Sequence, residues 1–118
     1  MDSRDLDLYY VSFINSAKET IALLKLNLKE DTDINLLHRL FHNLKGQAYF
    51  MNINDLASKC LEAESIIRKL LDNKQIIRES DLQSLKIFVK DIEFKLKKYE
   101  DTNRRRRQFF PKFLFDQA

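Results

Sequence analysis

The sequence predicts an all-α fold, specifically an antiparallel four-helix bundle with up-down-up-down connections. Three observations support this prediction. The 118 residues include one glycine, one proline and no tryptophan, so few residues favour turns. Apolar residues recur at steps of three and four in four long segments, which is typical of the buried side of a helix. No segment of useful length alternates apolar and polar residues as a β-strand does.

The first two expected helices are separated by a polar turn. Residues 5–29 form the first, and its predicted core positions are Leu6, Tyr10, Phe13, Ala17, Ile21, Leu24 and Leu28. Residues 34–51 form the second, with core positions Ile34, Leu37, Phe41, Leu44, Ala48 and Met51. Either Thr32 or Asp33 can cap the second helix, because both side chains can accept a hydrogen bond from a free backbone N–H.

The third and fourth expected helices follow with similar patterns. Residues 55–72 form the third, with core positions Leu56, Cys60, Ala63, Ile67 and Leu70. Asn52 tolerates the left-handed conformation that ends helices, and Asn54 can cap the third helix. Residues 81–103 form the fourth, with core positions Leu82, Leu85, Val89, Ile92, Leu96 and Tyr99. Ser80 followed by Gln83 fits a capping box at its start.

The last fifteen residues differ in composition from the rest. We therefore assign residues 1–103 to the bundle and residues 104–118 to a basic, Phe-rich tail. The chain has a net charge of +3, and arginines 104–107 alone contribute four positive charges, so the rest of the chain is close to neutral. They precede a group of apolar residues, Phe109, Phe110, Phe113, Leu114 and Phe115, around Pro111. We expect the tail to fold back as a short fifth element, with self-association or partner docking through it as the alternative. A short basic cluster is weak evidence for other partners, so we expect no nucleic acid and no stable membrane insertion.

Cysteine content and hydropathy indicate a cytoplasmic protein. Cys60 is the only cysteine, which excludes an internal disulfide and favours a reducing compartment. No apolar run approaches the roughly 18 residues that span a bilayer. The N-terminus lacks the basic-then-apolar order of a signal peptide. Met1 and the Phe-rich end favour a complete small protein.

The only glycine lies inside the second expected helix, where it costs roughly 1 kcal/mol relative to alanine. Gly46 follows His42 by four residues, and Lys45 lies on the same side of the helix. A histidine can accept a phosphoryl group on a ring nitrogen, and a cation such as Lys45 stabilises the charge of that group. A glycine here leaves room for another molecule to reach the imidazole. Glu64, on the following helix, is the nearest carboxylate that could bond the second ring nitrogen.

The pentapeptide His42-Asn43-Leu44-Lys45-Gly46 resembles the His-x-Leu-Lys-Gly signature of histidine phosphotransfer (HPt) domains. The likeness covers about residues 5–100. Asn52 falls where the family usually has a second glycine, and the third-helix pattern of the family is matched by Leu56, Cys60, Ala63 and Glu64. A glutamate at position 64 is similar to the phosphotransfer domain of chemotaxis-type histidine kinases.

The resemblance implies a four-helix carrier that is not itself an enzyme. Its partners would be a histidine kinase and the receiver domains of response regulators, whose aspartate exchanges the phosphoryl group with the carrier. By this resemblance His42 is phosphorylated, and the residues that assist it are Lys45, Gly46 and Glu64. Further contacts to the phosphoryl group or the partner are expected from His38, Tyr49 and Arg68. No cofactor is expected on this chain, because the Mg²⁺ of the transfer belongs to the receiver.

Two alternatives remain open from the residues. A helical scaffold that docks a receiver or kinase without carrying phosphate is one, since Gln47 and Tyr49 are bulky residues beside the site. A metal site at His38 and His42, one turn apart, is the other. A stable zinc site needs a third and a fourth ligand, but Cys60 is assigned to the core and only Glu64 is otherwise near, so we expect no metal. We expect Cys60 to be a small buried hydrophobe.

Overall fold

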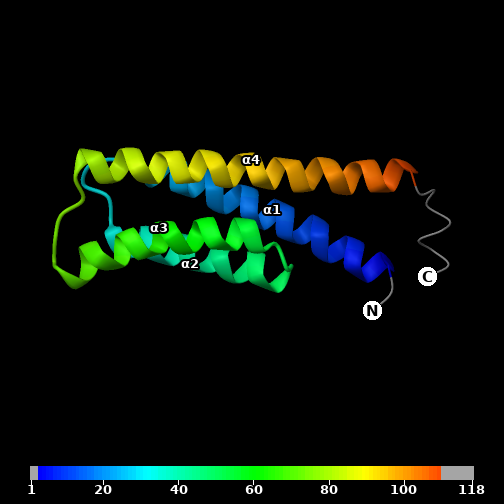
Figure 1. Cartoon of the computed structure of the whole chain (residues 1–118), viewed down its shortest axis with the longest axis horizontal. Helices are drawn as coiled ribbons and strands as arrows, with labels where there is room; N and C mark the ends of the chain where they lie inside the picture. The colour runs from blue at the N-terminus through cyan, green and yellow to red at the C-terminus, as the bar shows by residue number, and fades with distance from the viewer. Residues whose placement is uncertain (1–2, 110–118) are drawn as a thin grey trace.

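The computed structural model describes residues 3–109 and confirms the predicted all-α four-helix bundle. Helix α1 spans Ser3–Asn27, α2 spans Ile34–Phe50, α3 spans Asn54–Asp72 and α4 spans Glu79–Phe109. The helices run alternately up and down, and α1 and α4 extend together past the α2–α3 turn (Figure 1). The helices of the described chain include none that is long and apolar enough to cross a membrane.

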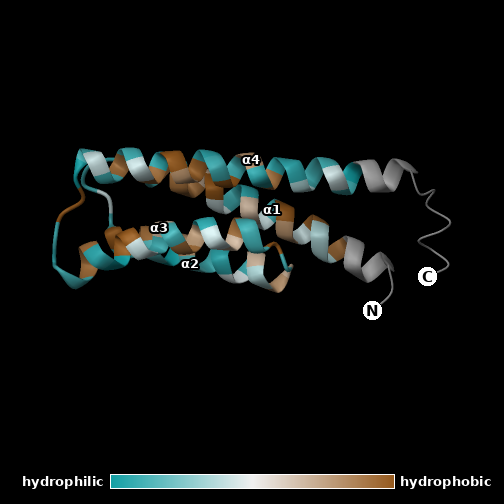
Figure 2. Cartoon of the chain, in the orientation of Figure 1, coloured by the Kyte–Doolittle hydropathy of each residue, from teal (hydrophilic) through white to brown (hydrophobic). Residues whose placement is uncertain are grey.

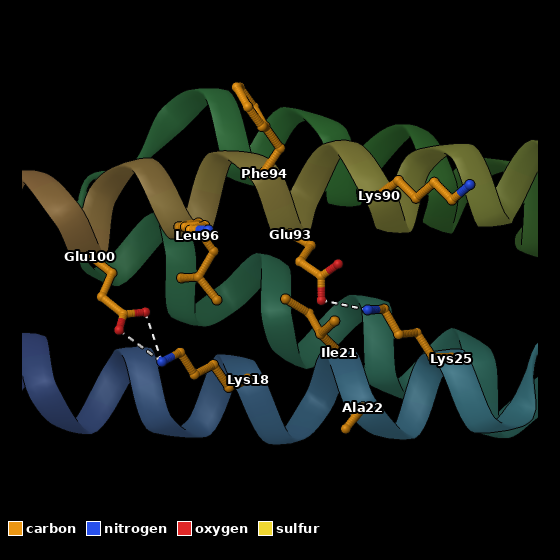
Figure 3. Close-up of a pocket in the computed structure, with 10 residues that line it drawn as sticks. Lys18, Ile21, Ala22, Lys25, Lys90, Glu93, Phe94, Leu96 and Glu100 are labelled. Carbon is orange, nitrogen blue, oxygen red and sulfur yellow. Dashed lines mark hydrogen bonds and ion pairs between the residues drawn. The ribbon is translucent and has the colours of Figure 1, made fainter.

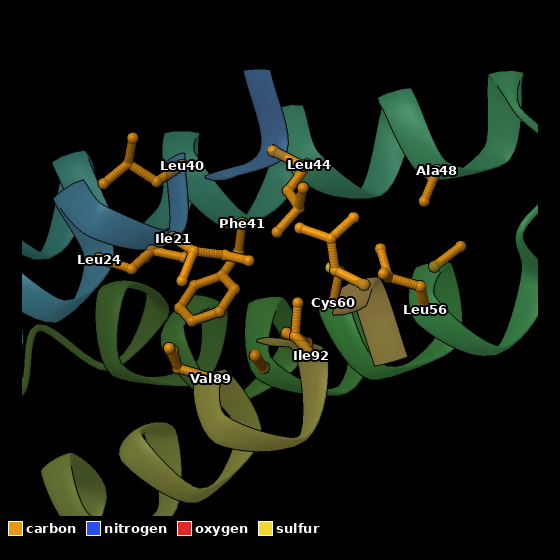
Figure 4. Packing of buried hydrophobic residues seen from close by; sticks show 14 of the residues in the cluster. Ile21, Leu24, Leu40, Phe41, Leu44, Ala48, Leu56, Cys60, Val89 and Ile92 are labelled. Carbon is orange, nitrogen blue, oxygen red and sulfur yellow. The ribbon is translucent and has the colours of Figure 1, made fainter. Parts of the chain in front are cut away.

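The core follows the long axis of the bundle. Helix α1 packs against α2 and α4, and α3 packs against the same two helices, so the bundle closes. Hydrophobic residues lie mainly on the sides of the helices that face one another (Figure 2). Phe41 of α2 is fully buried. Its ring points into the space between Ile21 of α1 and Val89 of α4 (Figure 4).

Most predicted core positions are buried. The exceptions are partly exposed and are Tyr10, Ile34, Met51 and Tyr99, while the side chain of Leu6 lies outside the described residues. Four further hydrophobic residues are buried that the periodicity did not select: Ile14, Leu40, Ile53 and Ala57. Helix α2 is covered by α1 on one side and α3 on the other, so its apolar stripe is wider than a single seam.

Two residues were predicted to mark the turn between α2 and α3, and the structure confirms one of them, Asn52. Asn52 adopts a left-handed φ of 62°, and the N–H of Ile53 donates to the carbonyl of Ala48 at 2.8 Å, as in a Schellman motif. The prediction that Asn54 caps α3 is wrong, because Asn54 is already the first helical residue and the cap position is Ile53. Ile53 is drawn into the core, so the helix begins earlier than the polar residue suggests.

The ends of the other helices also differ in part from expectation. Of the two cap candidates for α2, Asp33 is used, and its side chain accepts from the N–H of Asn35. The predicted capping box of Ser80 and Gln83 is wrong, because α4 begins at Glu79. Asp81 instead accepts a hydrogen bond from the N–H of Arg78 at 3.0 Å.

Helix α4 does not end near residue 103 but continues through the arginines to Phe109. Arginine is a good helix former, and Arg104 pairs with Glu100 and Asp101 one turn earlier. The assigned boundary between bundle and tail therefore lies inside a helix. Residues 110–118, which include most of the Phe-rich tail, lie outside the described residues, so its fold-back remains a prediction.

Two ion pairs cross from α1 to α4 on the outer side of the bundle (Figure 3). Lys18 Nζ lies 2.8 Å from a carboxylate oxygen of Glu100, and Lys25 Nζ lies 2.5 Å from Glu93. Both lysines are about half exposed, so each pair adds at most about 1 kcal/mol to stability. The pairs are seven residues apart on each helix, which matches the antiparallel alignment of α1 and α4.

Replacement of Phe41, the buried aromatic residue of α2, tests the packing of the core. We expect Phe41→Ala to lower the free energy of unfolding by about 3–5 kcal/mol, because it removes buried area and leaves a cavity. Urea unfolding followed by circular dichroism measures the change. Phe94→Ala is the matched control, since Phe94 is 69% exposed and its truncation should change stability by about 0.5 kcal/mol or less. Equal losses in the two variants would contradict the placement of Phe41.

Candidate functional site

His42 stands on the outer face of α2, with 57% of its side-chain surface exposed. Its neighbours Phe41 and Leu44 are fully buried, so the helix backbone at His42 is held against the core. Nδ1 of His42 lies 3.0 Å from Oε1 of Glu64, which projects from α3. The α2–α3 hairpin thus joins a surface imidazole to a carboxylate that is only 1% exposed.

Glu64 gathers nitrogen groups from both helices. Its Oε2 accepts a hydrogen bond from Lys45 Nζ at 2.6 Å. Its Oε1 lies 3.3 Å from Nη2 of Arg68 and 3.4 Å from Nε2 of His38, in addition to His42. Burial of a carboxylate is costly unless charge and hydrogen bonds compensate it. Here two permanent cations face one carboxylate, so the cluster is net positive even when both histidines are neutral.

The ionisation of Glu64 determines the tautomer of His42. Burial alone would raise the pKa of the Glu64 carboxyl. The hydrogen bonds and charges of Lys45 and His42 outweigh burial and hold that pKa below its ordinary value of 4.5. Glu64 is therefore ionised at neutral pH and can only accept hydrogen bonds. Nδ1 of neutral His42 must carry the hydrogen, which leaves the lone pair on Nε2.

Gly46 is exposed on α2, one turn after His42. A Cβ atom built on Gly46 meets no atom within 4 Å, so packing inside the described chain does not require a glycine. Its φ is not positive, so the backbone does not require one either. Apart from its cost to helix stability, the missing side chain therefore affects only what approaches the surface of α2 beside the imidazole.

A shallow groove of about 360 Å³, here called the Gly46 groove, lies beside this glycine between α1 and α2. The rings of Tyr9 and Phe50 meet edge to face at its rim, with centroids 6.2 Å apart. Phe50 is 75% exposed, and Tyr49 beside it is half exposed. The sequence analysis did not select Phe50 as a site residue. Phe50 follows His42 by two steps of four residues, so it lies on the same side of the helix. Tyr9 was missed because no spacing along the chain links it to α2.

Gln47 does not lie over the imidazole, although it directly follows Gly46. Its Nε2 donates to Oγ of Ser16 on α1 at 3.0 Å, so the side chain is directed toward α1. The bulk of Gln47 thus packs across the α1–α2 seam. Of the two bulky residues noted beside the site, only Tyr49, which is half exposed, presents its side chain at the surface of α2.

Arg68 and His38 reach the same carboxylate from different positions. Arg68 is mostly exposed and lies one turn beyond Glu64 on α3. His38 is only 26% exposed and its ring stacks on that of His42, with centroids 6.1 Å apart and an angle of 11° between the planes. Within the described part of the chain, no group of three or more His, Cys, Asp or Glu side chains could hold a metal ion.

Cys60 is buried in the core, as predicted. Burial, and next the charge of Glu64, raise the pKa of its thiol to about 12. The thiolate is the reactive form of cysteine, so this residue is a packing residue without nucleophilic character at neutral pH.

Comparison with known proteins gives one match. The family model described as Hpt domain matches residues 9–95, which extend from α1 into α4 and include His42, Gly46 and Glu64. No curated protein and no solved structure matches the chain.

The pKa of Glu64 predicts a pH-dependent contribution to stability. A carboxyl whose pKa is lowered by folding stabilises the folded state above its unfolded pKa, and the stabilisation disappears as pH falls through the folded value. We expect Glu64→Gln to cost about 1–3 kcal/mol at neutral pH, because Lys45 loses its ionic partner. The difference from wild type should shrink as pH falls below 4.5, measured by urea unfolding across pH.

Glu62→Gln is the matched control for this prediction, because Glu62 lies on the same helix but is about half exposed. Its effect should stay within about 0.5 kcal/mol at neutral and acid pH. A cost of Glu64→Gln that is the same at both pH values would contradict an ionised Glu64 as the source of the stabilisation.

Proposed function

The chain belongs to the Hpt domain family, and on this basis we propose that it is a phosphorelay carrier whose phosphoryl group is borne by Nε2 of His42. Histidine phosphotransfer in two-component signalling is the general activity of the family. The observation that supports His42 is its hydrogen bond to an ionised, buried Glu64. That bond assigns the hydrogen to Nδ1 and leaves Nε2 as the nucleophile.

The proposed reaction exchanges a phosphoryl group with an aspartyl phosphate of a receiver domain. The Nε2 lone pair attacks phosphorus, a P–N bond forms, and the P–O bond to the aspartate breaks, so that the aspartate leaves as a carboxylate. The imidazole keeps its Nδ1–H and gains positive charge. Ionised Glu64, 3.0 Å from Nδ1, stabilises that charge without moving. The reverse reaction returns the phosphoryl group to a receiver.

The cations of the cluster support transfer of a highly charged group. Lys45 compensates Glu64, whose charge would otherwise repel the phosphoryl oxygens. The guanidinium of Arg68 is the more exposed cation and is proposed to face the phosphoryl group or the partner. The Mg²⁺ of the reaction is assigned to the receiver. The ATP-binding kinase and the acceptor aspartate are likewise proposed to come from cytoplasmic partners, so this chain is a carrier and not an enzyme.

The Gly46 groove is proposed to receive the receiver domain. It begins one turn from His42 and carries the exposed rings of Phe50 and Tyr9 at its rim. An exposed apolar patch next to a reactive group favours protein contact. Gly46 provides clearance for that approach, and Tyr49 lies on the same helix as a further contact.

Phosphorylation of His42 can be tested directly. The purified protein is incubated with phosphorylated receiver domains, or with a histidine kinase and ATP, and the label on this chain is measured. We expect acid-labile, base-stable label on the wild type and none on His42→Gln. Label that persists in His42→Gln would show that another residue is the acceptor. No label with any partner, despite binding, would favour the scaffold function.

Replacement of Gly46 separates access from stability. We expect Gly46→Ala to raise the free energy of unfolding by up to about 1 kcal/mol, because alanine favours the helix and the new Cβ meets no atom. Transfer from a phosphorylated receiver should nevertheless slow, because the methyl group occupies the approach to His42. Stopped-flow or quench-flow transfer rates and urea unfolding measure the two effects. Ser58→Ala, exposed on α3, is the control that should leave transfer unchanged. Unchanged transfer in Gly46→Ala would refute the access role.

A further inference from the structure

A second groove of about 670 Å³, here called the Phe94 groove, lies between α1 and α4 (Figure 3). Its lining includes Ile21 of α1 and Leu96 of α4, which are buried in the core and form an apolar floor. Phe94 also lines the groove, although the residue is 69% exposed. The described residues around the groove come from α1 and α4 alone, and it shares none of them with the Gly46 groove or the His42 site. An occupant of the Phe94 groove would therefore leave His42 uncovered.

The Phe94 groove carries more positive than negative charge. Four lysines and two glutamates line it. Both glutamates already pair with the two lysines that α1 contributes (Figure 3). Lys90 and Lys97 are the two lysines of α4, and neither lies within ion-pair distance of a carboxylate of the described residues. Two cations at the groove are therefore available to carboxylates of another molecule.

The ring of Phe94 lies among these unpaired charges. Lys90 precedes it by four residues, and Lys97 and Lys98 follow it by three and four, so all three share its side of α4. Among the described residues, no cation lies over the ring of Phe94. A single exposed apolar side chain is ordinary, but this one adjoins an apolar groove and a set of unpaired lysines. The combination favours a partner segment that is apolar at one position and acidic on either side of it.

We propose that the Phe94 groove docks an acidic amphipathic helix of a partner protein. The groove runs along two antiparallel helices, which suits a third helix laid beside them. An apolar side chain of the partner packs on Phe94, and its carboxylates pair with Lys90 and Lys97. These lysines are seven residues apart, or about 10 Å along α4, so the partner helix carries acidic residues at positions i and i+7 and an apolar residue at i+3 or i+4. This docking site is additional to the proposed carrier function and does not require phosphorylation of His42.

Other occupants match the charges of the groove less well. A second copy of the chain, docked face to face, would bring lysines against lysines, because a two-fold interface joins the same surface of each copy. A bilayer or a nucleic acid presents phosphates along its whole surface, including opposite Glu93 and Glu100. A helix can instead place its carboxylates opposite Lys90 and Lys97 alone.

The test selects binders to the immobilised full chain from a display library of helical peptides. Two library positions seven residues apart vary among glutamate, glutamine and lysine, and the two positions midway between them vary among leucine, alanine and serine. We expect the wild type to enrich peptides with glutamate at both outer positions and leucine at a central one. The affinity of the most enriched peptide, measured by fluorescence anisotropy, should fall at least about tenfold in Phe94→Ala and in the double variant Lys90→Glu/Lys97→Glu. The double variant should enrich peptides with lysine at the outer positions.

Two matched variants control for loss of apolar surface and for reversal of charge. Leu61→Ala shortens an exposed apolar side chain of α3. The double variant Arg39→Glu/Lys69→Glu reverses two exposed charges on α2 and α3. Both controls should bind the peptide within about twofold of the wild type at physiological salt, which screens distant charges. Amide chemical shifts of the wild type should change along residues 18–25 and 90–100 when the peptide binds, and not around His42.

Each outcome decides the proposal. Absence of enrichment on the wild type overturns it, as does enrichment that is retained in Phe94→Ala and in the Lys90 and Lys97 double variant. Shift changes confined to α2 and α3 overturn it too, because they place the peptide elsewhere. Co-sedimentation with vesicles of phosphatidylcholine and phosphatidylserine, without peptide enrichment, would identify a membrane surface as the occupant instead. A dimer that Phe94→Ala dissociates, again without enrichment, would identify a second copy. Circular dichroism establishes that each variant is folded before it is compared.

Discussion

The contact between Glu64 and the nitrogen groups around it is the interaction on which the site depends. A carboxylate that is 1% exposed is tolerated in this core because Lys45 and Arg68 compensate its charge and His42 and His38 approach the same atoms. The cluster joins α2 to α3, so the groups that stabilise the hairpin also define the chemistry. Ionised Glu64 orients the imidazole of His42 and, in the proposed transfer, would stabilise the charge that a phosphoryl group creates on the ring.

The bundle holds this cluster in place through neighbours in the chain. Phe41 lies in the core and His42, the next residue, lies at the surface, so packing of one side chain positions the other. The Schellman turn at Asn52 and Ile53 ends α2 and starts α3, which aligns Glu64 with the imidazole. Ion pairs between α1 and α4 lie on a different seam of the bundle (Figure 3), so the α2 surface stays open around His42 and Gly46.

The two histidines of α2 lie on one helix face but differ in exposure. The ring of His42 is largely open to solvent, whereas the ring of His38 is partly buried and stacks on it. The Gly46 groove adds an apolar surface between α1 and α2, one turn from His42. The charged cluster around Glu64, the exposed imidazole of His42 and the Gly46 groove therefore lie within a few turns of α2, and α1 and α3 complete them.

The sequence by itself determined the four helices, most of their core stripes and the shared face of His42, Lys45 and Gly46. These features follow from the 3.6-residue period and from local side-chain chemistry. Tertiary packing decided the rest. Burial of Ile53 moved the start of α3 to Asn54, and pairing of Arg104 with earlier carboxylates accompanied the extension of α4. The near-complete burial of Glu64, the approach of His38 to its Oε1 and the meeting of Tyr9 with Phe50 depend on the register between helices. No local spacing encodes that register, because it is set by how complete helices pack together.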